Sequence, residues 1–435
     1  MRVLEAKKPE AQEFLARLKK RFFYPAKLEN DVRKIISAVQ EKGDEALISY
    51  TRKFDCPNFS VEDLRVCPDK IEQAYTKIDT ETLRAIRLAI ANVTSFHEKQ
   101  KERSWIETRS NRALLGQLVR PVDSAGLYVP GGTGGETPLV STVIMGAVPA
   151  KVAGVARVVM VSPPNKEGKL HPALLVAAKE AGVEEIYRVG SAWAIAALAF
   201  GTETIPKVDV ICGPGNIYVT IAKKILAGLV GIDMIAGPSE ILIIADDTAP
   251  ASWLAADLLS QAEHDPLATA LLFTDSPKLA KEVSRELEKQ LAKLPRQKIA
   301  SQALQNQGGI LITQGLEEAL EIANEIAPEH LELCVKDPYA LLPALKHAGA
   351  VFLGAYTPEA VGDYIAGANH VLPTMGCARY AQALGVHVFL KKISLISYSY
   401  KALLEEAPAV IHLARLEGLE AHARAVEIRL KASGS

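Results

Sequence analysis

The sequence lacks the marks of a disulfide-bonded, a nucleic-acid-binding or a membrane-spanning protein. Its cysteines are odd in number, no two form a CxxC pair, and they stand at positions 56, 67, 212, 334 and 377. Dispersed thiols of this kind are typical of a reduced protein, so we expect a cytoplasmic location. The 50 Lys and Arg residues are matched by 51 Asp and Glu residues, and this balance predicts no bulk attraction to nucleic acid or to an anionic membrane.

Long apolar runs and the common nucleotide-binding signatures are missing as well. The longest apolar region, 138–162, is broken by Pro149, Lys151 and Arg157, which indicates core elements rather than a membrane span. The first twenty residues are charged and lack the apolar core of a secretory signal. No glycine-rich loop reads GxGxxG or GxxxxGK, so the fingerprints of a dinucleotide fold and of a P-loop are absent from the sequence.

What the chain does contain is an alternation of strand and helix patterns. Residues 28–105 have apolar residues at helical spacing, most clearly in 31–55 and 80–101. From 106 onward, short β-branched runs alternate with helical segments, which favours parallel sheets covered by helices. We expect strands at 126–130, 156–162, 185–189, 208–212, 240–246, 269–274, 309–313 and 349–354, with helices at 173–182, 194–200 and 252–264. One ordinary open sheet does not hold so many strands, so we predict two α/β units and a helix-rich tail from 384.

Four turns of this pattern contain unusual residues. In doubly wound sheets, ligands bind beyond the carboxyl ends of the strands, where the chain turns into a helix. The turns are YVPGGTGGETP (128–138), CGPGN (212–216), AGPSE (236–240) and the helix end SQAEH (260–264). We therefore expect the functional site at these turns.

Two pairs of polar residues are candidates for metal binding and for acid–base chemistry. Gln261 and His264 are three residues apart and share one face of a helix, so an amide oxygen and an imidazole could reach one cation. Glu329 and His330 follow Pro328, which disfavours helix before it and predicts a strand edge or a turn. A carboxylate beside an imidazole is suited to general acid–base catalysis. Taken alone, each pair is more often a cap or a solvated turn.

Further candidates lie near the C-terminus. Asp363 and His370 follow the strand expected at 349–354, and Asp363 offers a hard oxygen ligand for zinc. Glu417 and His422 lie in the tail, in LEGLEAHARAVEIRL. Taken singly, Asp363 is more often a loop cap, and His422 is more often a residue of a solvated helix face.

Jointly, these segments resemble one family, histidinol dehydrogenase, across nearly the whole chain. The motifs that carry the resemblance, in chain order, are GLYVPGG (126–132), AIAALAFGTETIPKVD (194–209), GPGNIYVT (213–220), GIDMIAGPSEILIIAD (231–246), LLSQAEHDP (258–266), APEHLEL (327–333), GDYIAGANHVLPT (362–374) and EGLEAHARAVEIRL (417–430). The resemblance implies oxidation of L-histidinol through L-histidinal to L-histidine, with two NAD, in the last steps of histidine biosynthesis.

The resemblance also implies the roles of individual residues. It assigns the acid–base pair to Glu329 and His330. It assigns the zinc ligands, the substrate contacts and the NAD contacts as follows: zinc to Gln261, His264, Asp363 and His422; the substrate to Ser239, Gln261, His264, His330, Asp363, His370, Glu417 and His422; NAD to Tyr128, Trp193 and Asn216. In the scheme that these roles imply, zinc holds the substrate, His330 removes the alcohol proton, and Glu329 assists addition of water to the aldehyde.

The fold implied is an α/β fold of two incomplete Rossmann-like parallel-sheet domains with small helical N- and C-terminal pieces. The corresponding ranges are 1–27 for an N-terminal helical arm, 28–105 with 237–383 for the zinc-binding catalytic domain, 106–236 for the NAD-binding domain and 384–435 for the tail. In this family the tail crosses to the other subunit, so the resemblance implies a homodimer in which Glu417 and His422 complete the partner's site.

The sequence departs from the family pattern in two places. Members commonly have Gln where Trp193 stands, and an indole has one N–H donor and no acceptor. One amide contact to NAD is therefore lost, although a flat ring can stack on a cofactor. The loop at 131–142 is also a few residues longer than usual.

Several alternatives stay open at this point. A relative acting on another small alcohol, such as a sulfonated diol, would share most of these motifs. A zinc hydrolase would use Glu329 and the metal to activate water without NAD, and a non-catalytic metal-binding protein would need only the ligands. A cysteine nucleophile, Cys212 or Cys377, would replace water in the second oxidation, but neither lies in a setting that predicts a low thiol pKa.

Overall fold

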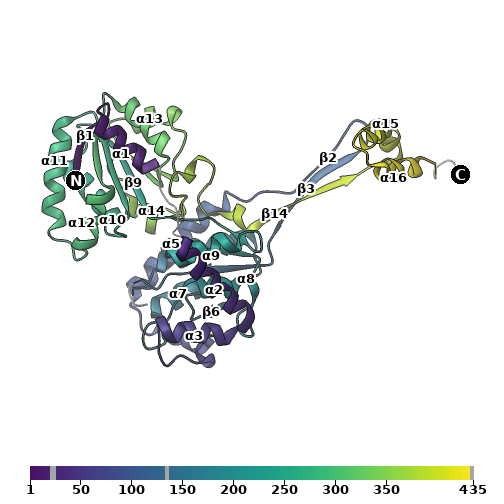
Figure 1. The fold of residues 1–435 in the computed structure, drawn as a ribbon, viewed down its shortest axis with the longest axis horizontal. Coiled ribbons are helices and arrows are strands. Elements are labelled where there is room, and N and C mark those ends of the chain that lie inside the picture. The colour runs from purple at the N-terminus through teal and green to yellow at the C-terminus, as the bar shows by residue number, and fades with distance from the viewer. Residues whose placement is uncertain (20–25, 133–136, 432–435) are drawn as a thin grey trace. The chain divides into compact units, whose positions relative to one another are not determined.

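The computed structural model describes residues 1–19, 26–132 and 137–431. Its residues divide into two compact units. The first comprises Met1–Gln100 and Asp123–Phe389, and the second comprises Lys101–Val122 and Leu390–Ser435. Figure 1 labels the elements of both units, which are described separately below.

One half of the first unit is built on a five-stranded parallel sheet within the described residues. Its order is β6-β5-β4-β7-β8, and the strands are β4 (Ser124–Tyr128), β5 (Arg157–Val161), β6 (Glu185–Tyr187), β7 (Val210–Cys212) and β8 (Gly231–Ile232). Numbered along the chain, this order is 3-2-1-4-5, which is the Rossmann order without its sixth strand. The buried strands are rich in β-branched residues, as expected for a parallel sheet covered on both faces.

Helices from two regions of the chain cover this sheet. Those between its strands are α6 (Val140–Ala153), α7 (Pro172–Glu180), α8 (Ser191–Phe200) and α9 (Ile217–Leu226), and those before it are α2 (Ala26–Lys42), α3 (Asp44–Phe54), α4 (Pro68–Tyr75) and α5 (Thr80–Glu98). The helix expected over 31–55 is interrupted at Gly43, where φ is +52°. There the Glu203 carboxylate accepts a hydrogen bond of 2.8 Å from the backbone N–H of Asp44. A side chain at Gly43 would collide with that carboxylate.

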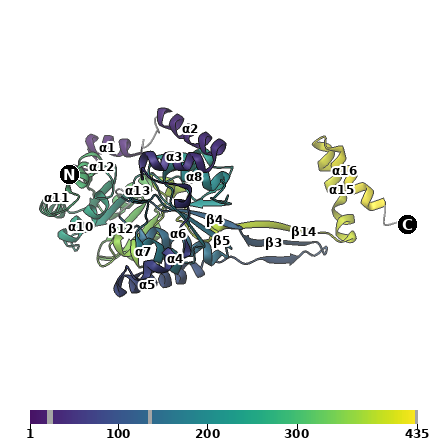
Figure 2. The same cartoon turned by 90° about the horizontal axis from the view of Figure 1, so that it is seen from below.

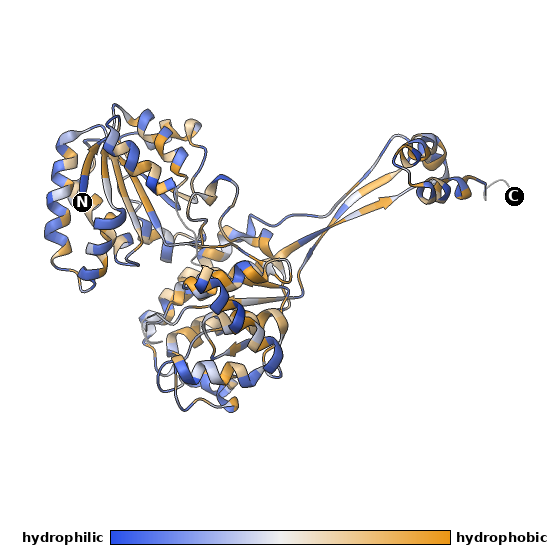
Figure 3. Ribbon diagram, in the orientation of Figure 1, coloured by the Kyte–Doolittle hydropathy of each residue, from blue (hydrophilic) through white to orange (hydrophobic). Residues whose placement is uncertain are grey.

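The other half of the first unit is built on a six-stranded parallel sheet. Its order is β1-β11-β10-β9-β12-β13, with strands β1 (Arg2–Glu5), β9 (Glu240–Ala245), β10 (Thr269–Thr274), β11 (Gly309–Ile312), β12 (His330–Cys334) and β13 (Ala350–Leu353). Strands β9 to β13 repeat the order 3-2-1-4-5, and β1 adds to the edge. The central strands are buried along their whole length, and Figure 3 shows them mostly in the hydrophobic colour.

Helices also pack against the six-stranded sheet. They are α1 (Pro9–Lys19), α10 (Ala251–Ala262), α11 (Pro277–Leu291), α12 (Gln297–Gln307), α13 (Leu316–Ile326) and α14 (Glu359–Tyr364). In α11 the buried residues Leu279, Val283 and Leu287 recur at helical spacing, so one face of the helix packs against the core.

The packing differs from the expected domain boundaries in two places. Residues 1–27 were expected to form an N-terminal helical arm; in the structure β1 pairs in parallel with β11, and Phe14 and Leu18 of α1 are buried in the core of the six-stranded sheet. Residues 28–105 were expected to join 237–383, but Val32 and Leu47 share a core with Tyr128 of the five-stranded sheet. Periodicity identifies the apolar face of a helix but not the surface that covers it.

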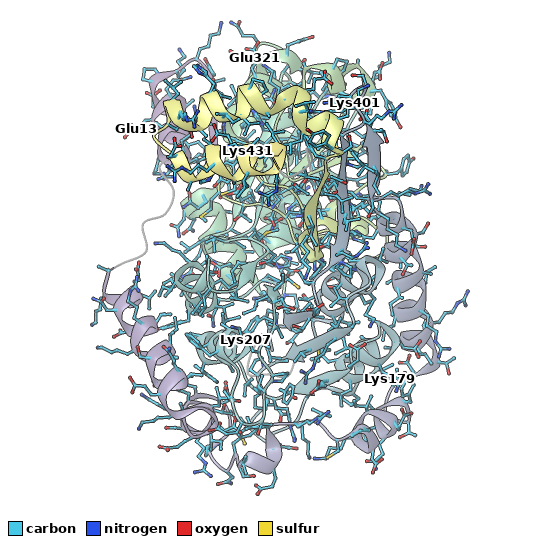
Figure 4. All side chains as sticks on the ribbon, turned by 90° about the vertical axis from the view of Figure 1, so that its right-hand side faces the viewer. Glu13, Lys179, Lys207, Glu321, Lys401 and Lys431 are labelled. Atoms are coloured by element: carbon cyan, nitrogen blue, oxygen red, sulfur yellow. The ribbon has the colours of Figure 1, made fainter. Side chains whose placement is uncertain are left out.

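The second unit is a small antiparallel sheet followed by two helices. The sheet has the order β14-β3-β2, with β2 (Trp105–Thr108), β3 (Leu114–Pro121) and β14 (Leu390–Ser397). Figure 2 shows β3 and β14 side by side. The helices are α15 (Tyr400–Leu416) and α16 (Glu420–Lys431), and Figure 4 labels Lys401 and Lys431 on them. The tail is thus helix-rich, as the sequence predicts, but its first strand was not expected.

Among the helices of the described residues, none combines the length and the apolar character that a membrane crossing requires.

Candidate active site

A cavity of about 450 Å³ lies in the first unit and is lined from both parallel sheets. The five-stranded sheet contributes the turn after β4, with Pro130 and Leu139, and the turn after β7, with Gly215 and Asn216. Strands β4 and β7 are neighbours at the point where the strand order reverses. The cavity therefore lies at the topological switch point, where open α/β sheets bind their ligands. Residues 133–136 of the longer loop lie outside the described residues.

The six-stranded sheet contributes its amino edge to the cavity. Ser239 directly precedes β9, and Glu329 directly precedes β12. Helix α10 returns from the carboxyl end of β9, so its last residues and the turn that follows bring Gln261 and His264 to the same edge. The expectation that all four turns lie at carboxyl ends of strands is therefore wrong for 236–240 and 260–264, since both segments lead into a strand instead of leaving one.

His330 is held as a neutral imidazole with one nitrogen available. Its side chain is buried, and its Nδ1 lies 2.9 Å from the backbone carbonyl oxygen of Glu240. That contact assigns the proton to Nδ1, which donates it to the carbonyl. The buried Nε2 has no hydrogen-bond partner within the described structure. Burial lowers the pKa of His330 to about 4, so at neutral pH Nε2 carries a lone pair that can accept a proton.

Glu329 is held by the same neighbouring residue. Its Oε2 accepts a hydrogen bond of 2.8 Å from the backbone N–H of Glu240 and lies 3.7 Å from Nδ1 of His330. Burial, and then the charge of Glu240, raise the pKa of Glu329 well above its usual range. The two backbone polar groups of Glu240 thus fix both members of the predicted acid–base pair.

Another buried acidic residue of the site, Glu359, was missed by the sequence analysis. It is the first residue of α14 and is buried, and its Oε1 lies 3.8 Å from Nδ1 of His330. Donor atoms of His330, Glu359 and Asp363 all lie within 4.8 Å of one another. The available signal was the spacing of Glu359 and Asp363, which is i,i+4 and places both carboxylates on one face of a helix.

Burial dominates the electrostatics of these carboxyl groups. It raises the pKa of Asp363 to about 6. It also raises the pKa of Glu359 well above its usual range, with the charge of Asp363 as the next cause. Several buried acids in one cavity are costly when ionised together, so a bound cation would lower the free energy of their charged forms.

Two more predicted zinc ligands, Gln261 and His264, and the predicted substrate contact His370 line the same cavity. Gln261 is buried, and with its amide turned so that nitrogen faces Glu359, it donates to the two carboxylate oxygens at 2.7 and 3.1 Å. Its oxygen is then available to a cation. His264 lines the cavity, and desolvation lowers its pKa. Nδ1 of His370 lies 3.1 Å from the carbonyl oxygen of Asp363, and burial lowers its pKa to about 4. Amide oxygen, imidazole nitrogen and carboxylate oxygen are donors that suit zinc.

The tail residues belong to the second unit. Glu417 is the C-cap of α15, and His422 lies in α16. Both side chains are exposed.

The predicted NAD contacts divide into two kinds. Asn216 lines the cavity and caps α9, where its Oδ1 accepts the N–H groups of Tyr218 and Val219. Tyr128 and Trp193 are buried, and neither is among the described residues that line the cavity.

Trp193 packs within its own chain. It stacks on Tyr50 and Phe54, with ring centroids 5.5 and 5.6 Å away. The hydroxyl of Tyr128 accepts the N–H of Ser191. The rings of Trp193 and Tyr128 therefore belong to the hydrophobic core of the five-stranded half.

The cysteine alternative has no support in this geometry. Cys212 is fully buried in β7, and burial raises its thiol pKa well above the usual range. Cys377 has its sulfur 3.0 Å from the hydroxyl of Tyr380. Neither residue is among the described residues that line the cavity.

Two doubly wound sheets around a switch-point cavity, with a buried Glu–His pair and oxygen and nitrogen donors, define an α/β enzyme with an acid–base site. Comparison with known proteins identifies the family. The family model for histidinol dehydrogenase matches residues 19–430, so the chain belongs to the histidinol dehydrogenase family and is an NAD-linked oxidoreductase.

Individual relatives agree with this assignment. The chain is 55% identical over 400 residues to histidinol dehydrogenase of Desulfotalea psychrophila, covering 92% of each chain. It is 56% identical over 399 residues to that of Oleidesulfovibrio alaskensis, again covering 92% of each. The crystal structure of histidinol dehydrogenase from Elizabethkingia anophelis superposes with a TM-score of 0.93 at 38% identity, covering 100% of this chain and 99% of that one. At this similarity, a relative acting on a sulfonated diol is not favoured.

Proposed function

We propose that the protein oxidises L-histidinol through L-histidinal to L-histidine and transfers two hydrides to NAD. The observation that carries the proposal is the buried Glu329–His330 pair, which is fixed by the backbone of Glu240 beside a set of metal donors. Membership of the histidinol dehydrogenase family supports the choice of substrate.

Zinc would be held by Gln261, His264 and Asp363 of one chain together with His422 of the partner subunit. The chemistry of the first three residues fits the ion, because they offer one amide oxygen, one imidazole and one carboxylate in a single cavity. Glu359 would orient the amide of Gln261 by accepting hydrogen bonds from its nitrogen. When bound, the ion would hold the substrate through its nitrogen atoms and fix the alcohol carbon beside the cofactor.

In the first oxidation, His330 acts as the base. Its Nδ1–H is donated to the carbonyl of Glu240, so Nε2 is the nitrogen that takes the proton of the alcohol. The lone pair is available throughout the neutral range because the pKa of His330 is about 4. NAD, when bound, accepts the hydride that leaves the same carbon.

In the second oxidation, Glu329 assists addition of water to the aldehyde. Its raised pKa makes the carboxylate a stronger base than a solvated one, and the N–H of Glu240 fixes its orientation. The water loses one proton to Glu329, and His330 returns the alcohol proton to the aldehyde oxygen, which gives the hydrate. The neutral His330 then removes a proton from the hydrate while the second hydride departs to a second NAD. Ser239 and His370 line the cavity and would contact the substrate.

On the cofactor side, Asn216 is the contact that the cavity lining supports. Direct contact by Trp193 would require its ring to leave the stack with Tyr50 and Phe54. We therefore assign Trp193 and Tyr128 to the wall that supports the NAD site.

We further propose a homodimer in which the tail of each chain enters the partner's site. The second unit exposes many large apolar side chains, among them Ile106, Ile396, Leu413, Leu416 and Ile428, with exposed fractions of 56 to 75%. Exposed apolar surface of this extent is typical of a protein–protein interface. Glu417 and His422 would then complete the substrate and zinc sites of the partner. A cytoplasmic location is part of the same proposal.

The test is to follow NADH formation from L-histidinol with and without a chelator and to count NADH per histidine. Two NADH per histidine and loss of rate with the chelator are expected. Turnover without NAD reduction would favour a hydrolase instead. NADH formation from another small alcohol at a higher kcat/KM would exclude histidinol as the preferred substrate.

A further inference from the structure

A buried ion pair lies beside the cofactor edge of the five-stranded sheet and is not part of the acid–base site. Lys223, on α9, forms a close salt bridge with Asp233, which follows β8. The side chain of Lys223 is 3% exposed and that of Asp233 is 0% exposed. Among described residues, the pair is not in the cavity lining, so it has no direct route to substrate or cofactor.

Both charges of the pair engage one backbone residue, Gly213. The Nζ of Lys223 donates a hydrogen bond of 2.9 Å to the carbonyl oxygen of Gly213. The N–H of Gly213 donates a hydrogen bond of 2.9 Å to Oδ2 of Asp233. The two polar groups of Gly213 are thus held by two side chains that also hold each other, and the orientation of both its peptide units is fixed.

The position of Gly213 accepts no residue with a side chain. Its φ is +112°, a region that favours glycine. A Cβ at this position would lie 2.1 Å from the carbonyl oxygen of Tyr128. The turn after β7 therefore packs directly on the end of β4, at the switch point of the sheet.

The turn that begins at Gly213 is the one that reaches the cavity. Pro214, Gly215 and Asn216 follow it, and all three line the cavity. Asp233 also begins the segment that leads to Ser239, and its Oδ1 accepts the N–H of Met234 at 2.7 Å. One carboxylate thus connects two of the segments that line the cavity.

Stabilisation of the fold alone does not account for this buried ion pair. Burying two charges costs desolvation free energy that their attraction only partly offsets, and apolar replacements are often neutral or stabilising. The contacts with Gly213 point to a geometric role.

We propose that Lys223 and Asp233 are a positioning pair that holds the turn 213–216 in the shape that binds NAD. The inference rests on the proposed assignment of this edge to the cofactor. It implies that breaking the pair weakens cofactor binding while the acid–base site and the substrate site stay intact.

The experiment uses full-length enzyme with zinc and titrates NADH by fluorescence for Lys223→Met and for the double variant Lys223→Met/Asp233→Asn. Lys223→Met removes the donor to Gly213 and leaves the buried carboxylate unpaired, so it tests the pair directly. The double variant is neutral, keeps an acceptor for the Gly213 N–H, and remains informative if the single variant fails to fold. The matched control is Lys151→Met/Glu184→Gln, since Lys151 and Glu184 form an ion pair of 2.6 Å in the same half and also hold backbone groups.

In both Lys223 variants we expect the affinity for NADH to fall about ten-fold and the KM for NAD to rise about ten-fold. This is the factor expected from the loss of one hydrogen bond to a charged group. The KM for histidinol and kcat at saturating NAD should stay within about two-fold, since uniform cofactor binding alone is lost. The control pair should leave NADH affinity unchanged even if it lowers the melting temperature.

Wild-type NADH affinity in the folded double variant would overturn the proposal, as would an equal loss in the control. Failure of the unmodified enzyme to bind NADH would instead overturn the proposed function on which the inference rests. The two failures are therefore distinguishable in one titration series.

Discussion

Nδ1 of His330 lies 2.9 Å from the backbone carbonyl oxygen of Glu240, on the neighbouring strand. The partner is a main-chain atom of a parallel ladder, so the ring orientation is fixed by the sheet and not by a mobile side chain. The same residue donates its N–H to Glu329. One peptide segment therefore determines which nitrogen of His330 is basic and where the carboxyl group of Glu329 points.

Replacing His330 by Ala should lower kcat about a hundred- to ten-thousand-fold, the range of general base catalysis. Bound NADH and bound zinc should change little, because the proposed zinc ligands are other residues. His347→Ala is a suitable control, since His347 is absent from the cavity lining within the described chain. A loss of zinc equal to the loss of rate would identify His330 as a metal ligand.

Glu329→Gln should separate the two oxidations. The substitution keeps the hydrogen bond from the Glu240 N–H but removes the proton acceptor for water. Single-turnover measurements should give near-normal NADH from histidinol in the first step and a second step slowed about a hundred-fold or more. Equal slowing of both steps would contradict the division of labour. Cys212→Ala and Cys377→Ala should leave the second step intact.

Glu359→Gln should weaken zinc binding about ten- to a hundred-fold, as is usual when a residue that orients a metal ligand is lost. The reason is that the amide of Gln261 would face another amide instead of a carboxylate. His264→Asn, which removes a proposed direct donor, should cost more zinc than Glu359→Gln. Metal content after dialysis against graded chelator measures both, and the reverse order would exchange the two roles.

The stability of the metal-free enzyme should fall in mild acid through its buried histidines. The pKa of His370 is about 4 in the folded protein and about 6.5 in the unfolded chain. Between these values the unfolded chain binds the additional proton, so this contribution is complete above pH 6.5 and is lost as the pH falls toward 4.

From pH 6.5 to pH 5, wild type should lose about 1.5 kcal/mol more unfolding free energy than His370→Gln, in which this titration is absent. Urea unfolding at the two pH values measures the difference. Parallel losses in both proteins would mean that the pKa of His370 is the same in the folded protein as in the unfolded chain.

Subunit sharing predicts complementation between two inactive chains. A chain truncated after Ala407 lacks Glu417 and His422, and a full-length His330→Ala chain lacks the base. A mixed dimer has one site with His330 from the truncated chain and the tail from the other, so part of the rate should return on mixing after dissociation. The mixture staying as inactive as its components, with mixed dimers present, would exclude tail exchange.

Much of the fold is predictable from local pattern, and the exceptions have physical causes. The strand expected at 269–274 is observed as β10 with the same bounds, because its apolar run is continuous. Glu329 and His330 were predicted to lie at a strand edge or a turn because of Pro328, but strand β12 as a whole was not expected, since the buried Glu332 interrupts its apolar run. Strand β1 is four residues long and is stabilised by pairing with β11, a contact that no local pattern records.

The site shows the same division. Gln261, His264 and Asp363 were selected by motif resemblance, and the structure brings them to one cavity. Glu359 escaped because its i,i+4 spacing to Asp363 indicates a shared helix face but not that this face is buried beside His330. Contact of Trp193 with the cofactor stays a prediction, and the structure shows its ring stacked on Tyr50 and Phe54. Burial of an aromatic ring against a distant helix is not visible in its own segment.

The six-stranded sheet meets the cavity with its amino edge, and this has a practical consequence. The loops at 246–250, 275–276 and 335–337, which leave three of its strands, supply none of the described lining residues. In most open α/β enzymes such loops are the region where protein engineers find substrate preference. Here they are candidate positions for grafted peptides, affinity tags or new chain ends, with the reaction centre left unaltered.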